Sequence, residues 1–68
     1  MIVESTERPF MFNEMRPNER SVMHWLVGHQ NERISISQIS SELGLSEQEV
    51  DEAVDRLAGH YGLFNVWG

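Results

Sequence analysis

Gly44 constrains the fold of this chain most, because it separates two short segments that both have helical periodicity. Before it, Ile39 and Leu43 have the spacing that places two side chains on one face of a helix. After it, Ser46 and Glu49 have the capping-box spacing that marks a helix start. The apolar residues that follow share one helix face: Val50, Ala53, Val54 and Leu57. Glycine readily adopts the left-handed conformation that ends a helix, so the sequence predicts a helix over residues 38–43, a tight turn and a helix from residue 46 onward.

Further segments complete the predicted secondary structure. Pro17 suits the first position of a helix, and apolar residues recur at helical spacing over residues 18–30, which predicts a helix there. Residues 33–37 alternate between polar and apolar and are expected to form a short strand, with Ser37 as the N-cap of the next helix. Residues 63–67 are expected to form a strand that pairs, through residues 63–66, with residues 34–36. Ile2 and Val3 are compatible with one more short strand.

These elements predict one small domain that is mainly α with a small β component, a three-helix helix-turn-helix core with a minimal two-stranded sheet. An N-terminal arm is expected over residues 1–16 and the domain proper over residues 17–68. The chain has 68 residues and no cysteine, so apolar packing must stabilise it without disulfides or thiolate zinc ligands. No apolar run approaches the roughly 18 residues of a membrane span, and the first residues lack a secretory pattern, so a cytoplasmic protein is expected.

Residues 36–57 resemble the second and third helices of the winged helix-turn-helix family of transcription regulators. The positions that match the family's pattern are Ile39, Leu43, Gly44, Leu45, Ser46, Val50, Val54 and Leu57. Upstream, the stretch PNERSVMHWL at residues 17–26 is similar to the family's first helix. The resemblance implies a winged-helix-like fold over roughly residues 15–64, and that fold serves protein–protein contacts as well as DNA binding.

Two departures from the family bear on function. The family's third helix enters the major groove of DNA, and here its outward positions are Glu47, Gln48, Glu49, Asp51, Glu52 and Asp55. DNA binders gain affinity by neutralising phosphates, so a helix with five carboxylates and Arg56 as its one cation is expected to be repelled by DNA. Only six residues follow Gly62, too few for the two-stranded hairpin of the family's wing, so a truncated wing is expected.

The acidic third helix predicts a non-catalytic protein-interaction module, associated with transcription or gene regulation, that binds a basic surface of a partner protein. A role without any partner stays open. Glu47 and Glu49 lie in the first turn, where carboxylates interact favourably with the helix dipole. The remaining carboxylates, Asp51, Glu52 and Asp55, could serve solubility alone.

Catalytic, metal and cofactor sites are not expected. The sequence has no phosphate-binding loop, no nucleophile-elbow motif and no cysteine nucleophile, so an enzyme is not predicted. His24 and His29 are five residues apart, which places them on different faces of a helix, and His60 is distant in sequence. No cysteine completes a metal site, so neither a metal nor a cofactor is predicted.

The alternative function is a DNA-binding transcriptional regulator that acts as a homodimer. Its DNA contacts would be the basic residues Arg16, Arg20, Arg33 and Arg56, together with Gln48. Aromatic residues are enriched at interfaces, and the possible anchors for a dimer or another partner are Phe10, Phe12 and Trp67. The N-terminal aromatics could equally fold back onto the first helix and enlarge a small core. A third possibility is a structural subunit that completes a larger assembly.

Overall fold

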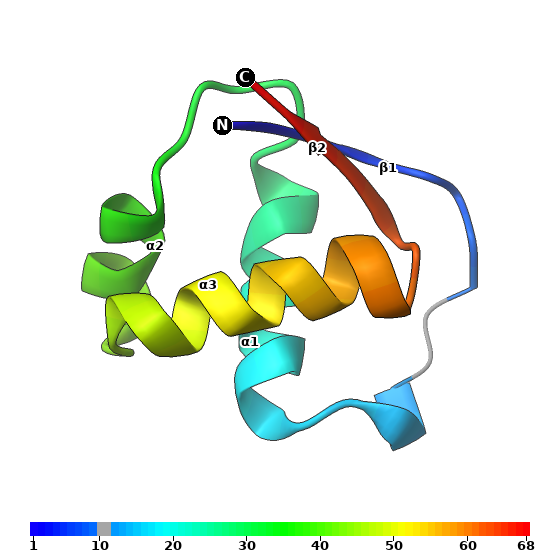
Figure 1. Ribbon diagram of the computed structural model, residues 1–68, viewed down its shortest axis with the longest axis horizontal. Coiled ribbons are helices and arrows are strands. Elements are labelled where there is room, and N and C mark those ends of the chain that lie inside the picture. Colours follow the sequence, from blue (N-terminus) through cyan, green and yellow to red (C-terminus); the bar gives the residue numbers. More distant parts are fainter. Residues whose placement is uncertain (10–11) are drawn as a thin grey trace.

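The computed structural model describes residues 1–9 and 12–68, apart from the side chain of Phe12, and folds into three α-helices and a two-stranded sheet. The elements are β1 (Ile2–Ser5), η1 (Phe12–Glu14), α1 (Pro17–Gly28), α2 (Ile36–Leu43), α3 (Glu47–Asp55), η2 (Arg56–His60) and β2 (Phe64–Trp67). The fold is mainly α with a small β component, as predicted. Figure 1 shows α3 crossing in front of α1, with α2 at one end of α3 and both strands above the helices. Over these residues no helix has the length and apolar character needed to span a membrane.

α1 begins with Pro17 at its first position, as the sequence predicts, and ends two residues before the expected position 30. A contact with β1 accounts for the early end. Asn31 has a left-handed backbone conformation, with φ of 65°, and its N–H donates to the carbonyl of Val3 at 2.9 Å. The chain therefore leaves the helix to bond to β1.

The strand expected over residues 33–37 is wrong, because α2 already begins at Ile36. Its N-cap is Ser35 rather than Ser37, and the Ser35 hydroxyl accepts the backbone N–H of Gln38 at 3.1 Å. The alternating pattern was ambiguous, since Ile36 also continues the helical spacing of Ile39. A serine N-cap satisfies a helix N–H that would otherwise lack a partner, and this local hydrogen bond favours the helix.

The turn and the start of α3 follow the prediction. Gly44 ends α2 with φ of 68°, and its N–H donates to the carbonyl of Ser40. The Ser46 hydroxyl accepts the N–H of Glu49 at 3.1 Å, while the Glu49 carboxylate accepts the N–H of Ser46 at 3.4 Å. α3 then continues into η2, a π-helical turn closed by a 2.8 Å hydrogen bond from the N–H of Tyr61 to the carbonyl of Arg56.

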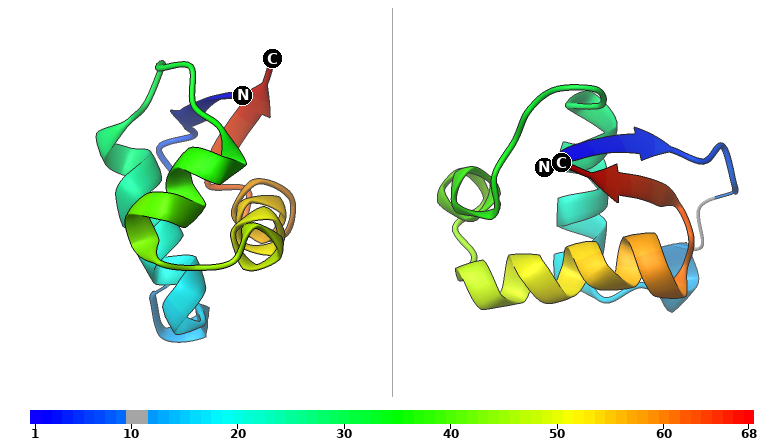
Figure 2. Two further views of the ribbon diagram at one scale, coloured as in Figure 1. Left: turned by 90° about the vertical axis from the view of Figure 1, so that its left-hand side faces the viewer. Right: turned by 45° about the horizontal axis from the view of Figure 1, so that its top comes forward.

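β2 pairs with β1, antiparallel, with Val3 opposite Val66 (Figure 2). The expected pairing of residues 63–66 with residues 34–36 is therefore wrong. Ile34 instead exchanges backbone hydrogen bonds of 2.8 and 2.7 Å with Met1, on the far side of β1 from β2. Because Ser35 is the N-cap of α2, Ile34 is the one residue of the expected strand that remains extended and can pair. The segment that lies beside β2 is β1.

The core lies between the sheet and the three helices. Its buried apolar residues come from all three α-helices, η2, both strands and the segments between them: Val3, Met15, Val22, Met23, Leu26, Ile34, Ile39, Val50, Ala53, Val54, Leu57, Tyr61, Leu63 and Phe64. One charged residue among those described, Glu19, is buried with them. This core fixes which side of α3 faces inward and which faces solvent.

Candidate interaction surface on the third helix

α3 contacts the core along one side only. Val50, Ala53 and Val54 are buried, and Leu57 extends the same side into η2. The rest of the helix surface is polar and exposed, and it consists of Glu47, Gln48, Glu49, Asp51, Glu52 and Asp55. The residues that the sequence assigns to partner binding thus all lie on the surface of one helix.

Glu47, Asp51 and Asp55, spaced four residues apart, form a row along α3 that we call the acidic row. None of their three side chains makes a hydrogen bond or ion pair with the part of the chain that the structure describes. Like charges at this helix spacing destabilise by about 0.2–0.5 kcal/mol per pair. Asp51 has such a neighbour on both sides, so the row lowers the stability of the helix.

The other two carboxylates of α3 have partners. Glu52 accepts the side-chain amide of Gln48 at 3.4 Å. Glu49 belongs to the capping box and also accepts the side-chain amide of Asn18 at 2.7 Å, which ties α3 to the start of α1. The hydrogen bonds from Ser46 and then from Asn18 hold the pKa of Glu49 below its ordinary value. Glu49 therefore has a structural role, as its capping-box position indicated.

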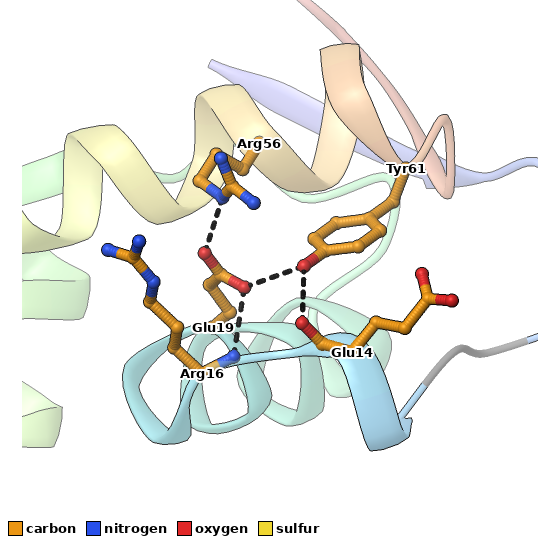
Figure 3. A network of polar contacts seen from close by, with 5 residues as sticks. All are labelled: Glu14, Arg16, Glu19, Arg56 and Tyr61. Atoms are coloured by element: carbon orange, nitrogen blue, oxygen red, sulfur yellow. Dashed lines mark hydrogen bonds and ion pairs between the residues drawn. The ribbon is translucent and has the colours of Figure 1, made fainter.

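A second polar feature, which no sequence pattern predicts, is centred on Glu19 and shown in Figure 3. Glu19 lies in the first turn of α1 and is 3% exposed. One carboxylate oxygen accepts the Nε–H of Arg56 at 2.6 Å. The other accepts the backbone N–H of Arg16 and the hydroxyl of Tyr61, both at 3.0 Å. Burial raises the pKa of Glu19, but these hydrogen bonds and the Arg56 charge outweigh it and hold the pKa below its usual range.

Tyr61 links this network to a second acceptor. Its hydroxyl oxygen lies 3.0 Å from the carboxylate of Glu19 and 3.0 Å from the backbone carbonyl of Glu14. A phenol has one proton, and the charged carboxylate is the stronger acceptor of the two. The Arg56 guanidinium also lies 5.6 Å from the centre of the Tyr61 ring, within cation–π range. The contacts with Tyr61 and then with Glu19 raise the pKa of Arg56 above its ordinary value.

The four arginines proposed as DNA contacts do not share one surface. Arg56 bonds to Glu19, and Arg16 directly precedes α1. Arg33 follows the other end of α1, a helix of 12 residues and hence about 18 Å long. Arg20 is exposed on α1. Arg16 and Arg56 line one hollow, whereas Arg20 and Arg33 are not part of its lining.

This hollow, of about 290 Å³, lies between the start of α1 and the side of α3. Its lining carries both signs of charge and consists of Arg16, Pro17, Asn18, Glu19, Glu49, Glu52, Ala53 and Arg56. Pro17 and Ala53 give it an apolar portion, and Glu52 connects it to the exposed side of α3. The hollow therefore adjoins the surface that bears the carboxylates of α3.

The aromatic and histidine residues singled out in the sequence lie in different surroundings. Phe10 and the side chain of Phe12 lie outside the described residues, and Trp67 is 46% exposed. His29 stacks on Trp25, with ring centres 3.7 Å apart, and its Nδ1 lies 2.7 Å from the Trp25 carbonyl. Across residues 1–9 and 12–68 no three His, Cys, Asp or Glu side chains cluster at metal-binding distances.

Comparison of the chain with protein-family models, curated proteins and solved structures gave no match.

Proposed function

We propose that this domain is a non-catalytic interaction module that binds a positively charged surface of another protein through the exposed carboxylates of α3. The acidic row carries the proposal. Its three side chains are exposed, lack an internal partner in the described structure and repel one another. Cations on a partner would remove that repulsion. The winged-helix resemblance supports a setting in transcription or gene regulation.

The spacing of the acidic row favours a particular kind of partner surface. Residues four apart on a helix are about 6 Å apart along its axis, so the row spans about 12 Å. Lys or Arg residues four apart on a partner helix have the same spacing, and alternate residues of a strand are about 6.7 Å apart. Arginine is the better match, because its guanidinium can bond to a carboxylate through two N–H groups.

The first experiment compares two chains as baits for partners. In the first chain, Lys replaces three carboxylates of α3: Asp51, Glu52 and Asp55. In the second chain, Lys replaces three exposed carboxylates that lie outside α3: Glu4, Glu14 and Glu32. Each triple raises the formal charge from −6 to zero, because every replacement adds two units. A partner of this surface should bind the wild type and the second chain but bind the first at least about tenfold more weakly.

The affinity of a captured partner should also fall as salt is added, because the carboxylates are exposed and the Debye length shrinks from about 10 Å at 0.1 M to about 3 Å at 1 M. Equal affinity of both triple variants would contradict the proposal. So would an affinity that salt leaves unchanged.

DNA binding, the alternative function, has less support. Five carboxylates on the exposed side of α3 would face the phosphates, while the Nε–H of Arg56 is already bonded to Glu19. An electrophoretic mobility shift at low salt, where electrostatic binding to DNA is strongest, distinguishes the two functions. We expect no shifted band, and specific retardation would favour the DNA-binding homodimer instead.

A further inference from the structure

β2 has one edge without a neighbouring strand in the described structure. The N–H of Thr6 donates to the carbonyl of Leu63 at 2.9 Å, so these two residues form a hydrogen-bonded pair of the antiparallel ladder. Hydrogen-bonded and non-hydrogen-bonded pairs alternate along such a ladder. Val66, opposite Val3, is in a non-hydrogen-bonded pair and directs its N–H and C=O away from β1.

The other side of the sheet agrees with this alternation. Val3 directs its carbonyl away from β2, because that carbonyl accepts the N–H of Asn31 at 2.9 Å. The N–H of Ser5 likewise bonds to the side chain of Gln30 at 2.6 Å. No residue that the structure describes bonds to the backbone of Val66, whereas on β1 the outward carbonyl of Val3 and the outward N–H of Ser5 both have partners.

The open edge is apolar and uncharged. Val66 is 37% exposed and Trp67 46% exposed. Residues 57–68 contain no Asp, Glu, Lys or Arg, although the chain carries a formal charge of −6. Charged side chains on an edge strand commonly prevent edge-to-edge pairing, and β2 has none. Figures 1 and 2 show that the C-terminal end of β2 lies at the margin of the molecule.

We propose that β2 pairs with β2 of a second copy of this chain, antiparallel and about a twofold axis beside Val66. In this arrangement the N–H of each Val66 donates to the carbonyl of the partner's Val66. Such an interface is self-complementary, as a twofold axis requires. Two copies that each carry −6 repel one another, and this uncharged edge lets them meet without opposing carboxylates. The acidic row of each copy lies on α3, outside this strand pair.

The paired strands have four residues each, so the contact is small and the dimer should be weak and concentration-dependent. Sedimentation equilibrium of the whole chain from about 10 µM to about 1 mM should show dimers at the upper end. Added salt should strengthen this association by screening the repulsion. Binding through the acidic row should weaken with salt, so the two proposals can fail independently. A chain that stays monomeric at about 1 mM would overturn the dimer.

A pair of variants tests the hydrogen bond itself. Val66→Pro removes the outward N–H, a position where an edge strand tolerates proline, while Val66→Ala trims the side chain and keeps the donor. We expect the proline variant to weaken dimerisation more than about a hundredfold and the alanine variant less than about tenfold. Equal losses in the two variants would overturn pairing through the backbone.

Amide hydrogen exchange of the unmodified chain gives a test that needs no variant. The Asn65 amide faces β1 and should be protected at every concentration, whereas the Val66 amide should gain protection as the concentration rises from about 10 µM to about 1 mM. Protection of Val66 that does not change with concentration would overturn the proposal.

Discussion

At Glu19 the chain keeps a carboxylate almost fully buried, and its neighbours make this possible. Three donors surround it, the Nε–H of Arg56, the hydroxyl of Tyr61 and the backbone N–H of Arg16. A buried charge is tolerated when it is paired and fully hydrogen-bonded. The network joins the start of α1 to η2 and also engages Arg56, the residue that follows α3. The same contacts that stabilise the fold thereby reduce the positive charge available to a nucleic acid.

Tyr61→Phe should lower the free energy of unfolding by about 1–2 kcal/mol, because it removes the hydroxyl that bonds to Glu19 and lies near the Glu14 carbonyl. The ring stays in place, so little packing is lost. Urea denaturation followed by circular dichroism measures the change. An unchanged stability would show that the hydroxyl makes no net contribution.

Glu19 should also make stability depend on pH. Its pKa in the folded chain lies below the unfolded value of about 4.3, so its contribution is fully present above that value and is lost as the pH falls through the folded pKa. Glu19→Gln removes this pH-dependent contribution to the free energy of unfolding. The stability difference between wild type and variant should therefore narrow between about pH 5 and pH 2.

Denaturation of both chains across this pH range checks the expectation. Glu49, whose pKa is also lowered, is present in both chains and cancels in the difference. If the free energies of unfolding of wild type and variant keep a constant difference down to about pH 2, this would contradict a lowered pKa of Glu19 in the folded state.

At the scale of elements, α3 combines a well-capped start with an unfavourable distribution of charge. Ser46 and Glu49 satisfy N–H groups at its first turn, which stabilises the helix. Further along, the acidic row places like charges at repulsive spacing. Natural proteins often retain such local losses of stability where function requires them. The row therefore lowers the stability of the helix, and cations of the proposed partner would offset this loss.

Asp51→Asn should therefore raise the free energy of unfolding by about 0.4–1 kcal/mol, because Asp51 repels both Glu47 and Asp55. Glu4→Gln is the matched control, because it removes one exposed carboxylate outside α3. Glu4 lies opposite the uncharged Asn65 in the sheet, so its replacement relieves no such repulsion and should give no gain. Thermal unfolding at low salt measures both changes, and an equal gain in the two variants would contradict the account of the acidic row.

For the molecule as a whole, the sequence predicted what depends on neighbouring residues. The helices, apart from the start of α2 at Ile36, follow from signals within a few positions, as do the left-handed Gly44 and the Ser46 cap. The outward position of the α3 carboxylates follows from helical periodicity, which the core confirms for Val50 and Val54. These features needed no knowledge of the rest of the chain.

Contacts between distant residues could not be predicted in the same way. Glu19 and Arg56 are 37 positions apart, and no local pattern distinguishes this glutamate from exposed ones, although its place two residues after Pro17 marks a first helical turn. The strand partner was missed for a related reason. Ile34 and Val3 are both apolar candidates for pairing with β2, and periodicity alone does not choose between them.

β1 places the first residues of the chain inside the fold, and this has a measurable consequence. Val3 is fully buried, whereas Glu4 next to it is exposed on the other face of the strand. Val3→Ala should lower the free energy of unfolding by about 2 kcal/mol through lost burial and the cavity it leaves. Glu4→Ala, the matched control, should change it by less than about 0.5 kcal/mol. If residues 1–16 were instead an arm separable from the domain, both substitutions would leave the unfolding transition of residues 17–68 unchanged.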